Sequence, residues 1–286
     1  MDLDLFEITE EVLDEAYNNA QTLTPGAAHY LHREDFILQF LMTHPGFDST
    51  NKADALRYYF TDGRKSAEKL RHLIDALGFD SQGLFRLLEF ASGYGCVTRH
   101  IPVVMPNVDL VSSDIHEAAT NFITEELGGQ SALSHNVPEA FEAPGTYDIV
   151  FALSFFSHMP RGTWMRWAIA LYNQLKPGGC LLFTTQGQYS LPHMHNPEIP
   201  EDGFWFKTES EQKDLDVEDY GQTIVTIDWA REHLSELQGS KIEMIAPGFW
   251  WDHQDLYVVR KEIPAPPPPS FGQKLKGLFK TETAPE

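Results

Sequence analysis

The chain has 286 residues, of which 42% are hydrophobic, which is enough for one large core with a small accessory region. Its net charge of -21 repels phosphate backbones and therefore argues against binding to nucleic acid. The sequence has no run of roughly 20 apolar residues, no basic and apolar signal segment and only two cysteines, and so predicts a cytoplasmic protein.

The first 80 residues are expected to form a helical cap. Apolar residues recur at helical spacing over 8–17, 52–60 and 66–77. Turn-forming residues at 43–50 and 61–66 predict a break before each of the last two helices.

From residue 84 onward, short apolar runs alternate with helical patterns. Such alternation is typical of an α/β fold with a parallel sheet and helices on both faces, whose ligands bind at the carboxyl ends of the strands. The expected strands are 85–90, 107–114, 147–156 and 179–187, and the helices between them are 97–105, 116–127 and 163–175.

The regular alternation stops after the fourth of these strands. The segment 188–222 is long and rich in proline, histidine and aromatic residues, and it is expected to be a lid, a binding loop or a disordered segment without secondary structure of its own. Its aromatic residues Phe204, Trp205 and Phe206 can close over a sugar or lipid, or can anchor the insertion to the core. A helix over 227–237 follows, and then two strands, 241–251 and 254–261, that can form an antiparallel hairpin at the sheet edge.

A proline-rich linker and a basic amphipathic tail occupy 263–286. Within 270–280, Lys274, Lys276 and Lys280 accompany a possible apolar helical face. Such a segment is a candidate for weak contact with the inner face of an anionic membrane or with a partner protein, and the alternative is a disordered end.

The turn after the first strand carries the clearest sign of a ligand. Gly93 and Gly95 follow a buried strand that contains Glu89, and glycines there allow a ligand to approach the backbone at a helix N-terminus. The third glycine position of a dinucleotide-binding turn falls on Thr98, so NAD fits poorly.

When the positions are counted backward from Gly95, the stretch EFASGYG over 89–95 resembles the acid-x-Gly-x-Gly-x-Gly motif of class I S-adenosylmethionine-dependent methyltransferases. Glu89 stands at the usual aspartate and Ala91 at the first glycine, where the extra methyl group can narrow the pocket. Further similarity to the family lies in the strand ending at Asp114, in 134–141, in 146–160 and in LKPGGCLLFTTQG over 175–187.

The resemblance implies a Rossmann-like class I methyltransferase sheet, mostly parallel with an antiparallel last strand, over 81–262. It also implies S-adenosyl-L-methionine as the cofactor, with Asp114 on the ribose hydroxyls and Asn136 near the adenine. The residues that it assigns to the cofactor are Glu89, Ala91, Gly93, Gly95, Asp114, Ile115, Asn136 and Ser154.

The run SFFSHMP and the later LKPGG and HQD also resemble a bacterial subgroup that acts on sugars, lipids and other small acceptors. The predicted reaction is therefore methyl transfer to a small acceptor, first of all to an oxygen of a sugar, a lipid-linked glycan or a related metabolite. The rivals are an NAD-dependent oxidoreductase and a non-catalytic cofactor-binding or scaffold protein that acts through its tail. The oligomeric state is left open.

Histidines supply the candidates for acid–base chemistry. His158, just past the strand at 147–156, is the first candidate for a general base, and its alternative role is to cap or pack the loop. His193 and His195 would point the same way on an extended chain and can serve as base or metal ligands, with a polar loop as the alternative. His253 and Asp255 can form a charged pair that orients the last hairpin.

Overall fold

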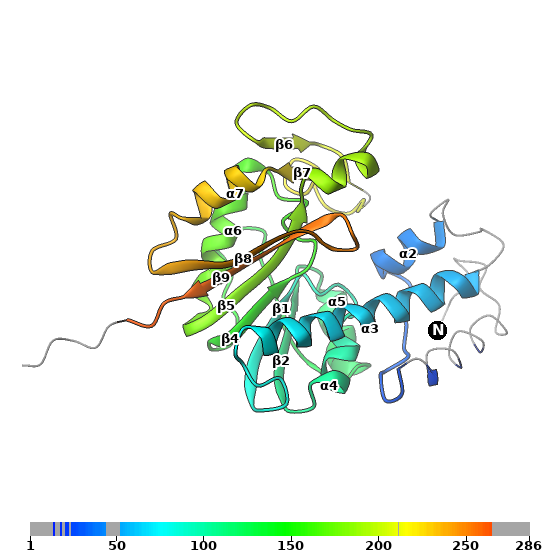
Figure 1. Cartoon of the computed structure of the whole chain (residues 1–286). Coiled ribbons are helices and arrows are strands. Elements are labelled where there is room, and N and C mark those ends of the chain that lie inside the picture. Colours follow the sequence, from blue (N-terminus) through cyan, green and yellow to red (C-terminus); the bar gives the residue numbers. More distant parts are fainter. Residues whose placement is uncertain are drawn as a thin grey trace, which may run out of the picture.

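The computed structural model describes residues 14, 18, 21–22, 24–43, 52–210 and 212–264. Within them lies a nine-stranded sheet in the order β3-β2-β1-β4-β5-β7-β6, with β9 paired to β5 and β8 paired to β9. Figure 1 shows this twisted sheet with helices packed on its faces. The proline-rich linker and basic tail lie beyond the described residues from 265 onward, as does the helix expected over 8–17 apart from Asp14.

The central strands are parallel, as the alternation of strands and helices predicts. Leu88 of β1 lies opposite Val111 of β2 on one side and opposite Val150 of β4 on the other. These strands run through the interior, which is why they read as continuous apolar runs. Their bounds are β1 (Phe85–Phe90), β2 (Val108–Asp114), β3 (Gln130–Leu133), β4 (Tyr147–Ala152) and β5 (Leu175–Gln186).

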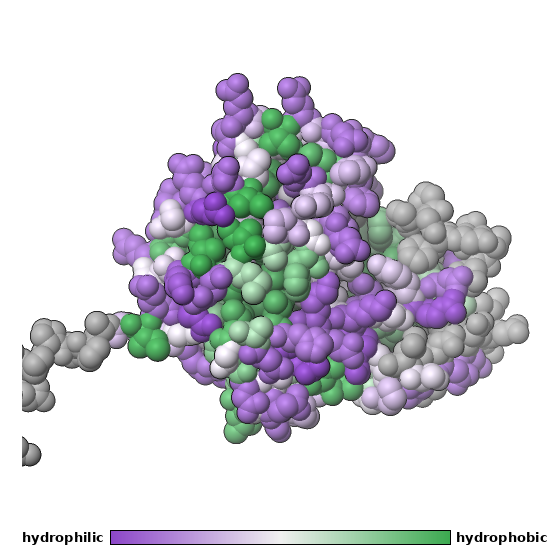
Figure 2. Space-filling model, viewed as in Figure 1, coloured by the Kyte–Doolittle hydropathy of each residue, from purple (hydrophilic) through white to green (hydrophobic). Residues whose placement is uncertain are grey.

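The closing hairpin consists of β8 (Ser240–Trp250) and β9 (Gln254–Lys261). β9 pairs antiparallel with β5, from Cys180 opposite Arg260 to Gln186 opposite Gln254, and β8 pairs antiparallel with β9. The antiparallel last strand and its position toward the sheet edge are therefore confirmed. Figure 2 shows apolar side chains gathered over this part of the front face, where most residues of β8 are only half-buried.

The expectation that 188–222 lacks secondary structure was wrong at both ends of the segment and in its middle. A 3-10 helix, η4 (Gln188–Met194), opens it, and β7 (Gln222–Val225) begins where it closes. β7 pairs in parallel with the end of β5, where Ile224 lies opposite Gln186, and it pairs antiparallel with β6 (Phe204–Lys207). Phe204 is buried against Trp229, with ring centroids 4.7 Å apart, so Phe204 anchors the insertion to the core.

Helices cover both faces of the sheet because successive strand residues point to opposite sides. Leu88 and the residues on its face of the sheet pack with Trp164 of α6 (Arg161–Asn173) and Trp229 of α7 (Ile227–Leu234). Leu87 and the residues on the other face pack with Leu70 of α3 (Lys52–Ala76). The helices are α2 (Phe36–Thr43), α3 (Lys52–Ala76), η2 (Thr98–His100), α4 (Ile101–Val104), α5 (Glu117–Glu125), η3 (Pro138–Ala140), α6 (Arg161–Asn173) and α7 (Ile227–Leu234).

The predicted break at 61–66 was wrong, because α3 continues through it as a single helix of 25 residues. Gly63 has a packing role here: a Cβ at this position would overlap the carbonyl oxygen of Cys96 and crowd His100. The glycine thus lets α3 lie against the loop after β1. A glycine that permits close approach has the same appearance in the sequence as one that ends a helix.

None of the helices in the described part of the chain has the length and apolar character needed to cross a membrane.

Candidate active site at the carboxyl ends of the strands

A cavity of about 1500 Å³ opens at the carboxyl ends of β1, β2 and β4. Its further walls come from α2, α3, the segment 212–222 and the turn between β8 and β9. The structure brings nearly all of the predicted cofactor residues, and the first candidate base, to this cavity, namely Glu89, Ala91, Gly93, Asp114, Ile115, Asn136, Ser154 and His158. Gly95 is the exception.

The turn after β1 uses left-handed backbone conformations. Ala91 has φ 57°, and Gly93 and Gly95 have φ 53° and 79°. A Cβ on Gly93 would meet nothing within 4 Å, so this glycine leaves space at the cavity wall. A Cβ on Gly95 would instead crowd Leu127 and Thr98, which shows that Gly95 serves local packing behind the turn.

Glu89 is buried beneath this turn. Its carboxylate accepts hydrogen bonds from Thr98 Oγ1 at 2.6 Å and from Ser112 Oγ at 3.1 Å. Burial raises the pKa of Glu89 to about 7, although the two hydroxyl donors oppose the rise. The carboxyl group therefore links the strand, the turn and the start of η2.

Asp114 ends β2 and is almost fully engaged by the protein. Its Oδ2 accepts from the Gly93 amide at 2.8 Å. Its Oδ1 accepts from the His116 amide at 3.0 Å and lies 2.7 Å from His116 Nδ1. These contacts fix the carboxylate against the glycine turn. Ile115 lies beside it at the cavity and is 37% exposed.

Asn136 reaches the cavity from the loop after β3. The Ser134 amide donates to the Asp114 carbonyl at 2.7 Å, which holds this loop beside the end of β2. Asn136 and Asp114 therefore both line the cavity.

Ser154 belongs to a polar network that joins β4, β5 and β9. Its φ is 60°, and its amide donates to Thr184 Oγ1 at 2.8 Å. The buried Gln254 side chain accepts from Thr184 at 2.7 Å and donates to Ser154 Oγ at 2.8 Å. Gln254 was missed by the sequence reasoning, because its partners lie 70 and 100 residues away in the chain.

His158 is buried at the cavity wall, between its own loop and the start of β7. Its Nδ1 donates to the Gly221 carbonyl at 2.9 Å, and its ring stacks on Tyr220 with centroids 4.3 Å apart. In the other direction, the Gly221 amide donates to the His158 carbonyl at 2.9 Å. The first hydrogen bond places the neutral ring's proton on Nδ1, so Nε2 carries the lone pair that a base needs.

The expected geometry of the other histidines was wrong. His193 lies in η4 and His195 has φ 61°, so neither is on an extended chain. His253 donates through Nδ1 to the Trp251 carbonyl at 2.9 Å, whereas Asp255 accepts from the Gly248 amide at 2.8 Å, so these two residues are held by backbone partners. The structure instead brings His193 and His253 together at the cavity, with ring centroids 4.8 Å apart.

Acidic side chains dominate the charge of the cavity. Among the described residues that line it, Lys213 is the one lysine or arginine, and its Nζ donates to the Ser210 carbonyl at 2.8 Å. The acids are Glu34, Asp35, Asp62, Glu89, Asp114, Glu117, Asp214, Asp216 and Asp219.

The fold and the turn, with a buried acid on β1 and a fixed acid ending β2, define a class I S-adenosylmethionine-dependent methyltransferase domain. A family model described as "Methyltransferase domain" matches residues 88–181. This stretch runs from β1 into β5 and contains all of the predicted cofactor residues and His158.

The chain is also similar to a curated protein, malonyl-[acyl-carrier protein] O-methyltransferase 2 of Ilyobacter polytropus. The two are 28% identical over 142 residues, which are 45% of this chain and 52% of the relative. The chain thus matches about half the length of that relative.

Solved structures share the fold at low identity. An S-adenosylmethionine-dependent methyltransferase from Clostridium acetobutylicum superposes with a TM-score of 0.52 and 13% identity, covering 75% of this chain and all of that one. An amino pentose methyltransferase from Micromonospora echinaspora gives 0.52 and 15%, covering 75% of this chain and 97% of that one.

Proposed function

We propose that the protein binds S-adenosyl-L-methionine in this cavity and transfers its methyl group to a small acceptor, first of all to an oxygen of a sugar, a lipid-linked glycan or a related metabolite. The observation that carries the proposal is the pairing of Gly93 with Asp114 across the carboxyl ends of β1 and β2. When bound, the cofactor supplies a methyl group on a positively charged sulfur.

The residues present fit such a cofactor. Gly93 leaves open space where a side chain would otherwise project, and the turn can therefore receive a ligand against its backbone. Asp114 has about four acceptor positions, and described donors take three of them, so one remains for a ribose hydroxyl. Asn136, Ile115 and Ser154 would line the same site.

The size and lining of the cavity support a second ligand beside the cofactor. Pockets for one small molecule have volumes of roughly 300–1000 Å³, and this cavity is larger. Phe36, Phe40 and Tyr58 supply an apolar wall from α2 and α3. The excess of acids favours a neutral or cationic acceptor over an anionic one.

His158 is the proposed general base for a hydroxyl acceptor. Its Nδ1 hydrogen bond to Gly221 fixes the tautomer, and the lone pair on Nε2 can take the proton that the hydroxyl loses. Methyl transfer is an in-line displacement, so the rest of the site needs chiefly to orient the acceptor.

The rival functions have less support. An NAD-binding turn would place a third small residue at Thr98, whereas this side chain is used beneath the turn as a donor to Glu89. A scaffold role through the tail concerns residues outside the described part of the chain.

Calorimetry tests the proposal. The full chain is titrated with S-adenosylmethionine, S-adenosylhomocysteine and NAD, and Asp114→Ala serves as the comparison. Tight binding of the first two that the substitution weakens is the expected result. Absence of binding to both would overturn the proposal. A turnover screen with sugars, glycans and amines then identifies the acceptor.

A further inference from the structure

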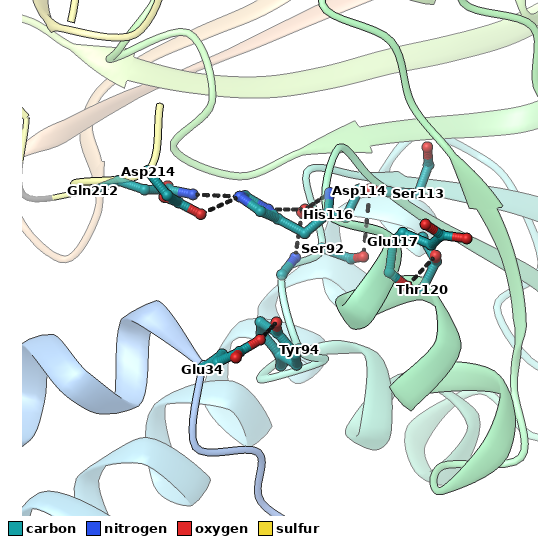
Figure 3. Close-up of polar contacts among 11 residues, drawn as sticks. Glu34, Ser92, Tyr94, Ser113, Asp114, His116, Glu117, Thr120, Gln212 and Asp214 are labelled. Carbon is teal, nitrogen blue, oxygen red and sulfur yellow. Dashed lines mark hydrogen bonds and ion pairs between the residues drawn. The ribbon is translucent and has the colours of Figure 1, made fainter. Parts of the chain in front are cut away.

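His116 connects the carboxylate that ends β2 to the segment that closes the cavity. Its Nδ1 lies 2.7 Å from Asp114 Oδ1, and its Nε2 lies 2.9 Å from Asp214 Oδ2. The amide nitrogen of Gln212 lies 3.1 Å from the same Nε2. Figure 3 shows the imidazole between Asp114 on one side and Gln212 and Asp214 on the other.

This bridge joins parts of the chain that are 98 residues apart, counted from His116 to Asp214. Asp114, His116, Gln212 and Asp214 all line the cavity. Asp114 is 6% exposed, and the Gly93 amide holds its other oxygen. A displacement of His116 would therefore free Oδ1 of Asp114 and release the segment 212–214 at the same time.

We propose that His116 is a positioning residue: it holds Asp114 in place for the cofactor ribose and ties the segment 212–214 across the cofactor side of the cavity. This inference rests on the proposed function only for the identity of the cofactor. The link from Asp114 through His116 to the segment 212–214, which we call the tie, is a property of the protein without ligand.

The protonation state of His116 decides how strong the tie is. The imidazolium donates from both nitrogens, to Asp114 and to Asp214. The neutral ring donates only to Asp114, and its Nε2 then accepts from the Gln212 amide while Asp214 faces a lone pair. The tie through Asp214 is therefore present at low pH and is lost as the pH rises.

The surrounding charges favour the imidazolium on balance. The hydrogen bond with Asp114 raises the pKa of His116, partial burial opposes this, and the charges of Asp114 and Asp214 add to the rise. Two further charged residues, Glu117 at the start of α5 and Lys213 on the segment, line the same cavity. The positive end of the α5 dipole also opposes protonation, because His116 is the N-cap residue of that helix.

Hydrogen exchange on the full chain without ligand tests the tie. Asp214→Asn removes the charge that accepts from Nε2. Glu218→Gln removes a charge from an exposed position of the longer segment 212–222 that does not line the cavity. At pH 6, Asp214→Asn should speed exchange in the amides around 212–216, by roughly 2- to 5-fold for a half-exposed ion pair. At pH 8.5 it should match the wild type, and Glu218→Gln should match it at both values.

Binding of S-adenosylhomocysteine tests the coupling to the cofactor site. The wild type should bind roughly 2- to 5-fold more tightly than Asp214→Asn at pH 6, and the two should converge at pH 8.5. In a His116→Gln background, which has no imidazole to protonate, the effect of Asp214→Asn on affinity should no longer depend on pH.

The outcomes separate the two proposals. The tie is overturned if the amides around 212–216 exchange at pH 6 at the same rate in Asp214→Asn and in the wild type, or if Glu218→Gln changes their exchange as much as Asp214→Asn does. This conclusion holds whether or not the cofactor binds. A wild type that shows the expected exchange but binds no S-adenosylhomocysteine supports the tie and overturns the proposed function. Equal affinity of wild type and Asp214→Asn at every pH overturns the positioning role.

Discussion

Thr98 donates a 2.6 Å hydrogen bond to the buried carboxylate of Glu89 across the turn that follows β1. The two residues are nine apart in sequence, at the strand and at the start of η2. Together with Ser112 of β2, Thr98 supplies the polar contacts of a carboxyl group that is 4% exposed. The turn is therefore fixed from beneath by a group that is costly to ionise.

Replacement of Glu89 by Gln should change the pH dependence of stability. The pKa of Glu89 is raised from 4.5 to about 7, chiefly by burial, so the native state holds this proton more tightly than the unfolded state. Stability is therefore lost as the pH rises through this window. The free energy of unfolding of Glu89→Gln, relative to that of the wild type, should therefore rise by on the order of 3 kcal/mol between pH 4.5 and pH 8.

Denaturant unfolding of both proteins at several pH values between 4.5 and 8 measures this difference. Glu125→Gln, at an exposed position of α5, is the control and should run parallel to the wild type. A difference between Glu89→Gln and wild type that stays constant across the range would contradict the expected titration.

Two substitutions at Ala91 should act in opposite directions. The residue has φ 57°, where a side chain costs roughly 1–2 kcal/mol. Ala91→Gly should stabilise the protein by up to about 1 kcal/mol, because the relief is partly offset by the entropy of glycine in the unfolded chain. Ala91→Val should destabilise it, because a β-branched residue is poorly tolerated there. Thermal unfolding decides, and a valine variant as stable as the wild type would disprove strain at this position.

Alanine at Gly63 should destabilise the protein, although glycine-to-alanine changes inside helices usually stabilise. A Cβ at Gly63 would overlap the Cys96 carbonyl, and separating α3 from that loop should cost roughly 1–3 kcal/mol. Gly162 of α6 is the matched control, because a Cβ there meets nothing within 4 Å, and alanine should stabilise by up to about 1 kcal/mol. Equal changes in stability at the two sites would refute the close packing of α3.

Substitutions at His158 can separate a base from a structural hydrogen-bond donor. His158→Ala should leave the affinity for S-adenosylhomocysteine nearly unchanged and lower turnover by roughly 10²-fold or more. Asn can donate from the position of Nδ1 to the Gly221 carbonyl but offers no ring nitrogen as a base. His158→Asn should therefore remain as slow as His158→Ala. Recovery of turnover in the asparagine variant would assign His158 to structure alone.

The local sequence was sufficient to predict the elements whose signals lie within one continuous stretch of the chain. The apolar runs at 85–90 and 254–261 predicted β1 and β9, and the turn from Glu89 to Gly95 predicted the ligand-facing edge of the sheet. These signals are readable because a strand that is buried on both faces needs apolar residues on both of them, and a tight turn needs residues that tolerate a positive φ.

The sequence by itself determined the order of the central strands β1, β2, β4 and β5, the helices between them, the closing hairpin and the turn at the cofactor side of the site. Only the tertiary structure decided which role a residue with two possible uses would take. Gly63 became a point of close packing within a continuous helix, and Phe204 became an anchor in the core. His116 gained Asp214 as a partner because folding brings 212–214 against the end of β2. Contacts between such distant segments depend on the packing of the whole chain, and no local pattern of residues encodes them.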